Sequence, residues 1–242
     1  MAKLVVVLSA LLALSTLSGC MMSGGPQVVG SGRPATQEYD LSGFTKVDVG
    51  SAFEVEIAAA DDYAVAVTVD DNLVEYLEVL VDGDTLRIGL KPRLGLGLRN
   101  MTLRARIAMP NIEGIDLSGA TRGRVSGFGR SELIEVDVSG ASQLRGELSA
   151  NEMRIEASGA SRVELIGATG PLEAKASGAS ELRLQDLSSD DTRVEVSGAS
   201  TIIVNATGAL TGEASGASTV RYKGTPASVN VESSGASTVR PQ

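Results

Sequence analysis

A four-residue motif that recurs at nearly constant spacing constrains this chain more than any other feature of its sequence. Six copies read Ser-Gly-Ala-Ser and one reads Ser-Gly-Ala-Thr. They begin at Ser118, Ser139, Ser158, Ser177, Ser197, Ser215 and Ser234, which are 21, 19, 19, 20, 18 and 19 residues apart. A unit this short cannot bury an apolar face alone, so successive copies must stack on one another.

The residues around each motif alternate between apolar and polar. Val136 and Val138 precede Ser139, Leu144 follows it, and the other copies keep nearly the same phase. An alternation with period two predicts strands that pair with their equivalents in the next copy. We therefore expect an all-β fold, a parallel β-solenoid of about 19-residue rungs, with a less regular β-rich N-terminal portion. Seven rungs would form a rod roughly 30 Å long.

The small residues of the motif allow two interpretations. Stacked serines could form a binding strip, or the motif could be a corner of the coil where only small side chains fit between neighbouring rungs. We favour the corner, because the geometry of a stacked repeat already requires small residues there.

The first twenty residues are typical of an export signal. Lys3 precedes an apolar run from Leu4 to Leu14, which is too short to span a bilayer as a helix. The following Leu17-Ser18-Gly19-Cys20 resembles the lipobox of bacterial lipoproteins. The resemblance implies a signal peptide over residues 1–19 and lipid attachment at Cys20. An ordinary signal peptide that happens to contain a cysteine is the alternative.

The remaining chain divides by composition. Residues 20–37 are rich in Gly, Ser and Pro and predict a flexible tether. We expect residues 38–242 to form a single β-solenoid domain, with an irregular part over 38–110 and the repeats over 111–242.

The irregular part contains several strand-like segments and two further signals. Strands are expected at 44–49, 53–57, 63–69, 79–81, 85–88 and 103–109. A short helix is expected from Asn72, as N-cap, to Leu77, and Asp82-Gly83-Asp84 predicts a hairpin turn. We expect this part to cover the N-terminal rung, whereas the C-terminal end, blunted only by Pro241, is a site for self-association.

Composition excludes several classes of function. The chain has no His, no Trp and one Cys. It therefore lacks a Ser-His-Asp triad, a His-containing zinc site and an intrachain disulfide, and we expect no cofactor and no metal. The net charge of -9 is spread along the chain, which argues against a nucleic-acid partner.

Two charged rows follow from the repeat register. The acidic row lies two residues before each motif and consists of Asp116, Asp137, Glu156, Glu195, Glu213 and Glu232, interrupted by Lys175. The basic row lies six residues after each motif start and consists of Arg124, Arg145, Arg183, Arg221 and Arg240, interrupted by Glu164 and Ile203. Like charges one rung apart repel by roughly 0.9 kcal/mol in water. One interpretation is that the rows bind ligands, with divalent cations on the acidic row and anionic glycans or phosphates on the basic row. The other interpretation, which we favour, is that both rows are solvated faces.

Several segments together resemble the head GIN domain family of auto-transporter adhesins. They are Phe44-x-x-Val47-x-Val49-x-x-x-Phe53-x-Val55-x-Ile57, Tyr63-x-Val65-x-Val67, Asp71-Asn72-Leu73 and Leu86-x-Ile88, followed by the Ser-Gly-Ala-Ser repeats. The resemblance implies a secreted or lipid-anchored bacterial envelope protein with a β-solenoid-like fold and an adhesin role.

The leading functional hypothesis is a non-catalytic, lipid-anchored cell-envelope protein with adhesin-like binding through extended solenoid faces. Its partners would be the membrane through the anchor and a glycan or envelope protein. Met21 after Cys20 is not Asp, so the lipoprotein resemblance favours the outer membrane. The alternatives are a carbohydrate-active β-helix enzyme that uses carboxylates and a structural module that self-assembles.

Overall fold

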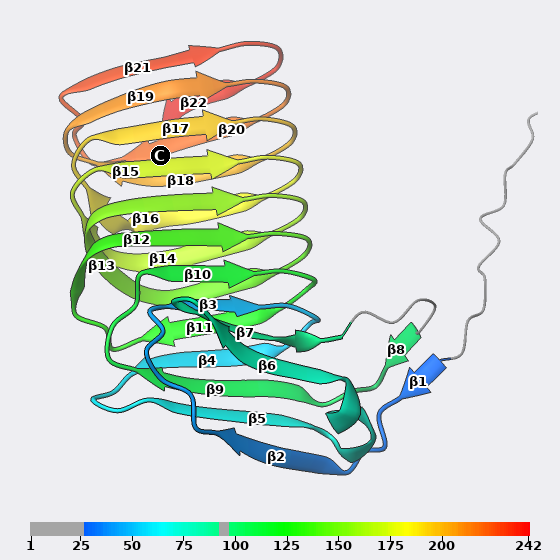
Figure 1. Cartoon of the computed structure of the whole chain (residues 1–242). Helices are drawn as coiled ribbons and strands as arrows, with labels where there is room; N and C mark the ends of the chain where they lie inside the picture. The colour runs from blue at the N-terminus through cyan, green and yellow to red at the C-terminus, as the bar shows by residue number, and fades with distance from the viewer. Residues whose placement is uncertain (1–26, 92–96) are drawn as a thin grey trace, which may run out of the picture.

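The stacked repeat forms a parallel β-solenoid, as the motif spacing predicts. The computed structural model describes residues 27–91 and 97–242. It is 63% strand and 3% helix, with about 7 turns and rungs about 19 residues apart. Figure 1 shows the coil rising from an N-terminal base to the C-terminal rung. The predicted signal peptide, Cys20 and residues 21–26 lie outside the described residues.

Each turn of the coil contributes one strand to each of two walls. The first wall contains the strands that precede the motifs, together with β7 and β3 from the N-terminal part. In stacking order these are β7 (Thr85–Leu90), β3 (Lys46–Val49), β10 (Gly114–Leu117), β12 (Arg130–Val138), the second half of β13 (Gln143–Ala157), β15 (Leu172–Ala176), β17 (Thr192–Val196), β19 (Ala209–Ala214) and β21 (Ser228–Ser233).

The second wall contains the strands that follow the motifs, together with β9 and β4. In stacking order these are β9 (Leu103–Met109), β4 (Glu54–Ala59), β11 (Arg122–Ser126), the first half of β13, β14 (Arg162–Thr169), β16 (Glu181–Ser189), β18 (Thr201–Ala206), β20 (Thr219–Lys223) and β22 (Thr238–Pro241). Every pairing within these two lists is parallel, so equivalent residues of successive rungs lie side by side.

Alternate side chains of both walls point into the coil and fill it. Val136 and Val138 of the first wall and Leu144 of the second are at most 3% exposed. Alanines take the same places in other rungs, where Ala157 and Ala176 are buried side by side in the ladder that runs from Val138 to Val196. The core is therefore one continuous column of small and aliphatic side chains, and the intervening residues of each strand face solvent.

The Ser-Gly-Ala-Ser motif forms the turn between the two walls. Gly178 has a φ of +75°, and a Cβ added there would lie 2.5 Å from the carbonyl oxygen of Gly159 in the rung before. That carbonyl accepts a hydrogen bond of 2.7 Å from the Ala179 N–H. The hydroxyl of Ser161, a buried fourth residue of the motif, donates to the Ser158 carbonyl at 2.7 Å. The motif is thus a corner, as favoured above. Its fourth hydroxyl bonds to a backbone carbonyl of its own turn, as at Ser161, or of the rung before, as at Ser218, which donates to the Val196 carbonyl.

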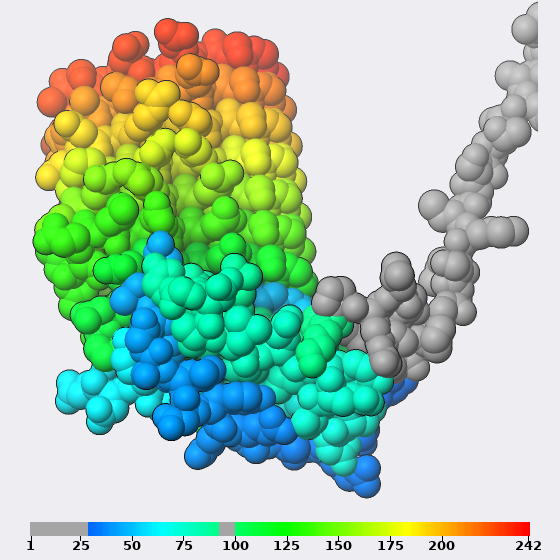
Figure 2. Space-filling model, viewed as in Figure 1, coloured from blue at the N-terminus to red at the C-terminus, as the bar shows by residue number. Residues whose placement is uncertain are grey.

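The N-terminal part extends both walls and then covers their lower ends. On the second wall, β5 (Ala64–Asp70) pairs antiparallel with β9, and β2 (Pro34–Tyr39) pairs antiparallel with β5. On the first wall, β6 (Leu77–Asp82) pairs antiparallel with β7 across the expected hairpin turn at Gly83. Figure 2 shows these segments gathered at the base of the rod. The expected cap over the N-terminal rung is therefore present.

Two details of this part differ from the sequence-based expectation. Strands β1 (Gln27–Val29), which pairs with β8 (Gly97–Arg99), and β2 extend regular structure into the range 20–37 where we expected a tether. The expected helix is a 3-10 helix, η1 (Asp71–Tyr76), whose N-cap is Asp70 and not Asn72. The Asn72 side chain instead accepts from the Ser31 N–H and donates to the Val29 carbonyl.

The C-terminal rung exposes apolar and backbone groups that lower rungs bury. Strands β21 and β22 each have one partner strand among the described residues. Val229 of β21 is 43% exposed, whereas Leu210, its partner in β19, is fully buried. Self-association through this end stays a prediction. None of the described helices is long and apolar enough to cross a membrane.

We expect Gly178→Ala to destabilise the coil by about 2–4 kcal/mol, because the new Cβ requires an unfavourable φ and meets the carbonyl of the rung below. Urea unfolding followed by circular dichroism measures the change. Gly129→Ala is the matched control, because nothing lies within 4 Å of a Cβ at that position. Equal stability of the two variants would contradict the role assigned to the turn.

Candidate functional site

The acidic row occupies one continuous column on the outer surface of the first wall. The register pairs each member with the equivalent residue of the next rung, from Asp116 to Glu232. The column also continues downward into the irregular part, through Asp48 of β3 to Arg87 of β7. These two residues were not predicted from the sequence as members of the row, although Val47-x-Val49 repeats the alternation found before each motif.

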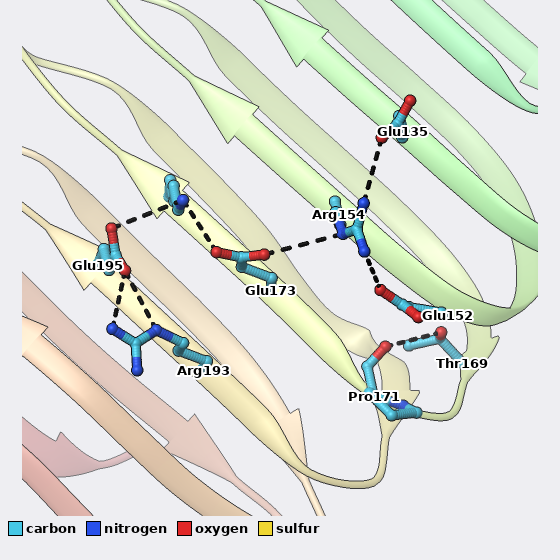
Figure 3. A network of polar contacts seen from close by, with 9 residues as sticks. Glu135, Glu152, Arg154, Thr169, Pro171, Glu173, Arg193 and Glu195 are labelled. Atoms are coloured by element: carbon cyan, nitrogen blue, oxygen red, sulfur yellow. Dashed lines mark hydrogen bonds and ion pairs between the residues drawn. The ribbon is translucent and has the colours of Figure 1, made fainter.

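A second outward column runs beside the acidic row and neutralises its middle. Arg154 lies 2.7 Å from Glu152, 3.4 Å from Glu135 and 3.9 Å from Glu173. The network continues from Glu173 through Lys175 to Glu195 and Arg193, with nitrogen to oxygen distances of 2.9–3.7 Å. Figure 3 shows these side chains lying across several neighbouring strands. The middle of the first wall is therefore a charge-balanced surface.

Below this network the carboxylates are less well compensated. Asp116 lies between Asp48 and Asp137 in the ladder and has no ion pair among the described residues, whereas Asp48 lies 3.8 Å from Arg87. Loss of hydration, followed by the charges of Asp48 and Asp137, raises the pKa of Asp116 to about 6. These residues line a shallow groove of about 490 Å³. Gly114 contributes no side chain to it.

The basic row occupies the equivalent column on the second wall. The register aligns it from Arg124 to Arg240, and Glu56 and Arg106 continue it downward. A second outward column runs beside it. Its members are Arg104, Glu54, Arg122, Gln143, Arg162, Glu181, Thr201, Thr219 and Thr238.

Most arginines of the second wall are paired with glutamates, but those of β11 are not. Ion pairs of 2.7–3.5 Å join Arg104 to Glu54, Arg106 to Glu56, Arg145 to Glu164, and both Arg162 and Arg183 to Glu181. Arg122 and Arg124 have no ion pair within the described part of the chain. They line a groove of about 370 Å³ together with Arg104, Arg106, Arg145 and their neighbours. Five arginines and two glutamates line this groove, so it is strongly basic.

The two walls therefore carry opposite charge, which the overall charge of -9 conceals. The two columns of the second wall hold nine arginines and four glutamates. The two columns of the first wall hold nine acidic and five basic residues. Because the coil separates the two surfaces, the second wall can attract anions despite the net negative charge of the chain.

The chemistry open to each wall differs. Planar guanidinium groups bind carboxylate, sulfate and phosphate with two parallel hydrogen bonds, so the second wall suits an anionic ligand. On the first wall, Asp116 and its neighbours project from the same side of one sheet. In the described ranges, 27–91 and 97–242, no three carboxylate or thiol groups converge as a metal site would require.

Comparisons with known proteins identify the fold and a family. A family model described as "Putative auto-transporter adhesin, head GIN domain" matches residues 43–226. A protein from Bacteroides fragilis described as a "putative adhesin" is 19% identical, with a TM-score of 0.83 over 89% of this chain and 100% of that chain. A "putative lipid binding protein" from Parabacteroides distasonis is 18% identical, with a TM-score of 0.72 over 90% and 100%. A "putative adhesin" from Parabacteroides merdae is 17% identical, with a TM-score of 0.68 over 89% and 99%. No curated protein matches the chain.

We expect Asp116→Asn to stabilise the protein at pH 7–8 by about 0.5–1 kcal/mol, after allowance for solvent screening. The folded-state pKa of about 6 lies above the ordinary value, so the native state keeps a proton between pH 4 and 6 that the unfolded chain loses. The stability of the wild-type protein therefore falls as the pH rises through 6, and the advantage of the variant should vanish near pH 4. Thermal unfolding across this pH range measures both effects.

Asp62→Asn is the control, since Asp62 is an exposed residue of the turn between β4 and β5. The stability difference between Asp116→Asn and wild type should be larger at pH 7 than at pH 4. An equal difference at the two pH values would show that solvent fully screens the charges of the row.

Proposed function

Because the chain belongs to the family described as "Putative auto-transporter adhesin, head GIN domain", we propose that it is a non-catalytic, adhesin-like protein of the bacterial envelope. We further propose that it is lipid-anchored through Cys20 and binds an acidic polysaccharide on its second wall. The family and the proteins of similar fold carry the descriptions "putative adhesin" or "putative lipid binding protein", which supports binding over catalysis.

The observation that carries this proposal is the pair of uncompensated arginines on β11. Arg122 and Arg124 lie two residues apart on one strand, so both guanidinium groups project from the same surface. Their ladder neighbours Glu54 and Glu56 are already paired with Arg104 and Arg106. The groove over these strands therefore offers two free guanidinium groups to an anion.

A polysaccharide fits this wall better than other polyanions do. The outward columns run along the stacking direction with one residue per rung, about 4.8 Å apart, and so offer a line of contacts to an extended polymer. Neither outward column of the second wall contains an aromatic residue. Proteins that bind single-stranded nucleic acid stack its bases on aromatic side chains, so their absence from these columns disfavours that partner.

The interior of this coil is filled, which limits where the chain could bind a lipid, the ligand named in the description of the protein from Parabacteroides distasonis. In this chain, residues such as Leu144, Val163 and Leu182 occupy the inside of the coil and are fully buried. A lipid would therefore contact the described part of the molecule on its outer surface and not inside the coil. Anionic vesicles are for this reason a necessary comparison for any anion bound by the second wall.

The anchor and the solenoid have complementary roles in this proposal. Several acyl chains at one cysteine exceed the marginal membrane affinity of a single chain, because each buried CH2 contributes about 0.8 kcal/mol. The segment between Cys20 and strand β2 would connect the anchor to the rod. Location in the outer membrane rests on the lipobox resemblance and on Met21 following the cysteine.

We expect Cys20→Ser to move the exported protein from the membrane fraction to the soluble fraction, because the acyl groups have no other thiol to attach to. Fractionation and intact-mass measurement of the full chain test this. Ser18→Ala, which keeps a small residue before the cysteine, should remain in the membrane fraction. Equal membrane association of the Cys20 variant would rule out the anchor.

We expect the triple variant Arg122→Gln, Arg124→Gln and Arg145→Gln to bind immobilised polygalacturonate at least tenfold more weakly than wild type, since the groove loses three positive charges. Surface plasmon resonance measures the affinity. Binding by wild type should also weaken as salt is added, because the contact is electrostatic.

The matched control removes three positive charges from the first wall, through Arg87→Gln, Arg154→Gln and Arg193→Gln. An equal loss in both variants would show that only net charge matters and would refute a site on the second wall. Preferential capture of anionic vesicles over polygalacturonate would assign the groove to lipid headgroups and refute the polysaccharide.

A further inference from the structure

The positive charge on the second wall is concentrated at two separate places. The lower one is Arg122 and Arg124 on β11, described above. The upper one is Arg221 on β20 and Arg240 on β22, which are ladder neighbours. Neither upper arginine has an ion pair among the described residues. The Arg221 Nε is also buried without a hydrogen-bond partner.

Every arginine in the two outward columns between these two places is ion-paired with a glutamate. Arg145 pairs with Glu164 at 3.3 Å, and Glu181 accepts from both Arg162 and Arg183 at 2.7 Å. The next rung, β18, presents Thr201 and Ile203, which carry no charge. Among the described residues, arginines without an ion pair therefore occur on β11 and on β20 and β22, and not on the strands of this wall between them.

The register fixes the distance between the two places. The column that contains Arg124 reaches Arg221 after five ladder steps, through Arg145, Glu164, Arg183 and Ile203. Five steps of about 4.8 Å give about 24 Å. Because all steps belong to one stacked wall, the separation cannot change unless the coil itself unfolds.

We infer that the second wall is a two-point binding site for a linear acidic polysaccharide, with a lower anion subsite at Arg122 and Arg124 and an upper anion subsite at Arg221 and Arg240. This inference rests on the proposed function and adds to it a minimum ligand length. A chain that spans about 24 Å binds both subsites at once, and the second contact is then intramolecular. A shorter chain occupies one subsite and leaves the other to solvent.

The test compares galacturonate oligomers of graded length with the polymer, on the full chain, by isothermal titration calorimetry. Affinity per ligand chain should rise at least tenfold once an oligomer exceeds the subsite separation, beyond the increase due to the number of sugar units. Arg122→Gln with Arg124→Gln should remove this step and leave short oligomers bound at the upper subsite. Arg221→Gln with Arg240→Gln should remove the same step from the other end.

Arg87→Gln with Arg193→Gln on the first wall is the charge-matched control and should retain the step. The two-point site would be overturned if the polymer binds but affinity shows no such step with oligomer length. It would also be overturned if the step persists in both double variants. Either result would leave the proposed function intact. No binding of any oligomer or of the polymer would overturn the proposed function itself. Equal affinity and an equal step with single-stranded DNA of matched length would overturn the assignment to a polysaccharide.

Discussion

The in-register stacking of one rung on the next is the constraint on which the rest of this structure depends. It is made by parallel backbone ladders in both walls and by the turn between them. In that turn the carbonyls of Gly140, Gly159, Gly178, Gly198 and Gly216 each accept a hydrogen bond from an alanine N–H of the following rung. Only glycine combines the positive φ of that turn with so close an approach, as at Gly178. The repeated motif is therefore the structural corner of the coil, and the chemistry lies on the walls that it joins.

Stacking also decides where charge accumulates. A residue that points outward in one rung is followed, about 4.8 Å away, by the equivalent residue of the next rung, so a preference repeated in sequence becomes a column on the surface. Opposite preferences before and after the motif place negative charge on the first wall and positive charge on the second. Glutamates and lysines inserted in these columns, such as Glu164 and Lys175, neutralise their middles. The uncompensated groups are left toward the ends, as at Asp116 and Arg122.

The sequence predicted the coil and both charged rows because each depends on a local period and a repeated register. The alternation around Ser139 places Val138 and Leu144 inside and Asp137 and Arg145 outside, with no tertiary information needed. The downward continuations through Asp48 and Glu56 were missed, because the N-terminal rungs lack the motif that sets the register. Which arginines remain unpaired could not be predicted either. Arg122 and Arg162 occupy equivalent positions, but only Arg162 has a glutamate within ion-pair distance.

A crystal structure of the protein with a bound galacturonate oligomer would test the central claim most directly, since it locates the ligand on one wall or the other. The account predicts sugar carboxylates within hydrogen-bond distance of the Arg122 and Arg124 guanidinium groups, with the chain running along the stacking direction toward Arg221. A ligand that lies on the first wall, along the Ser-Gly-Ala-Ser corner or against the end of the rod would contradict it.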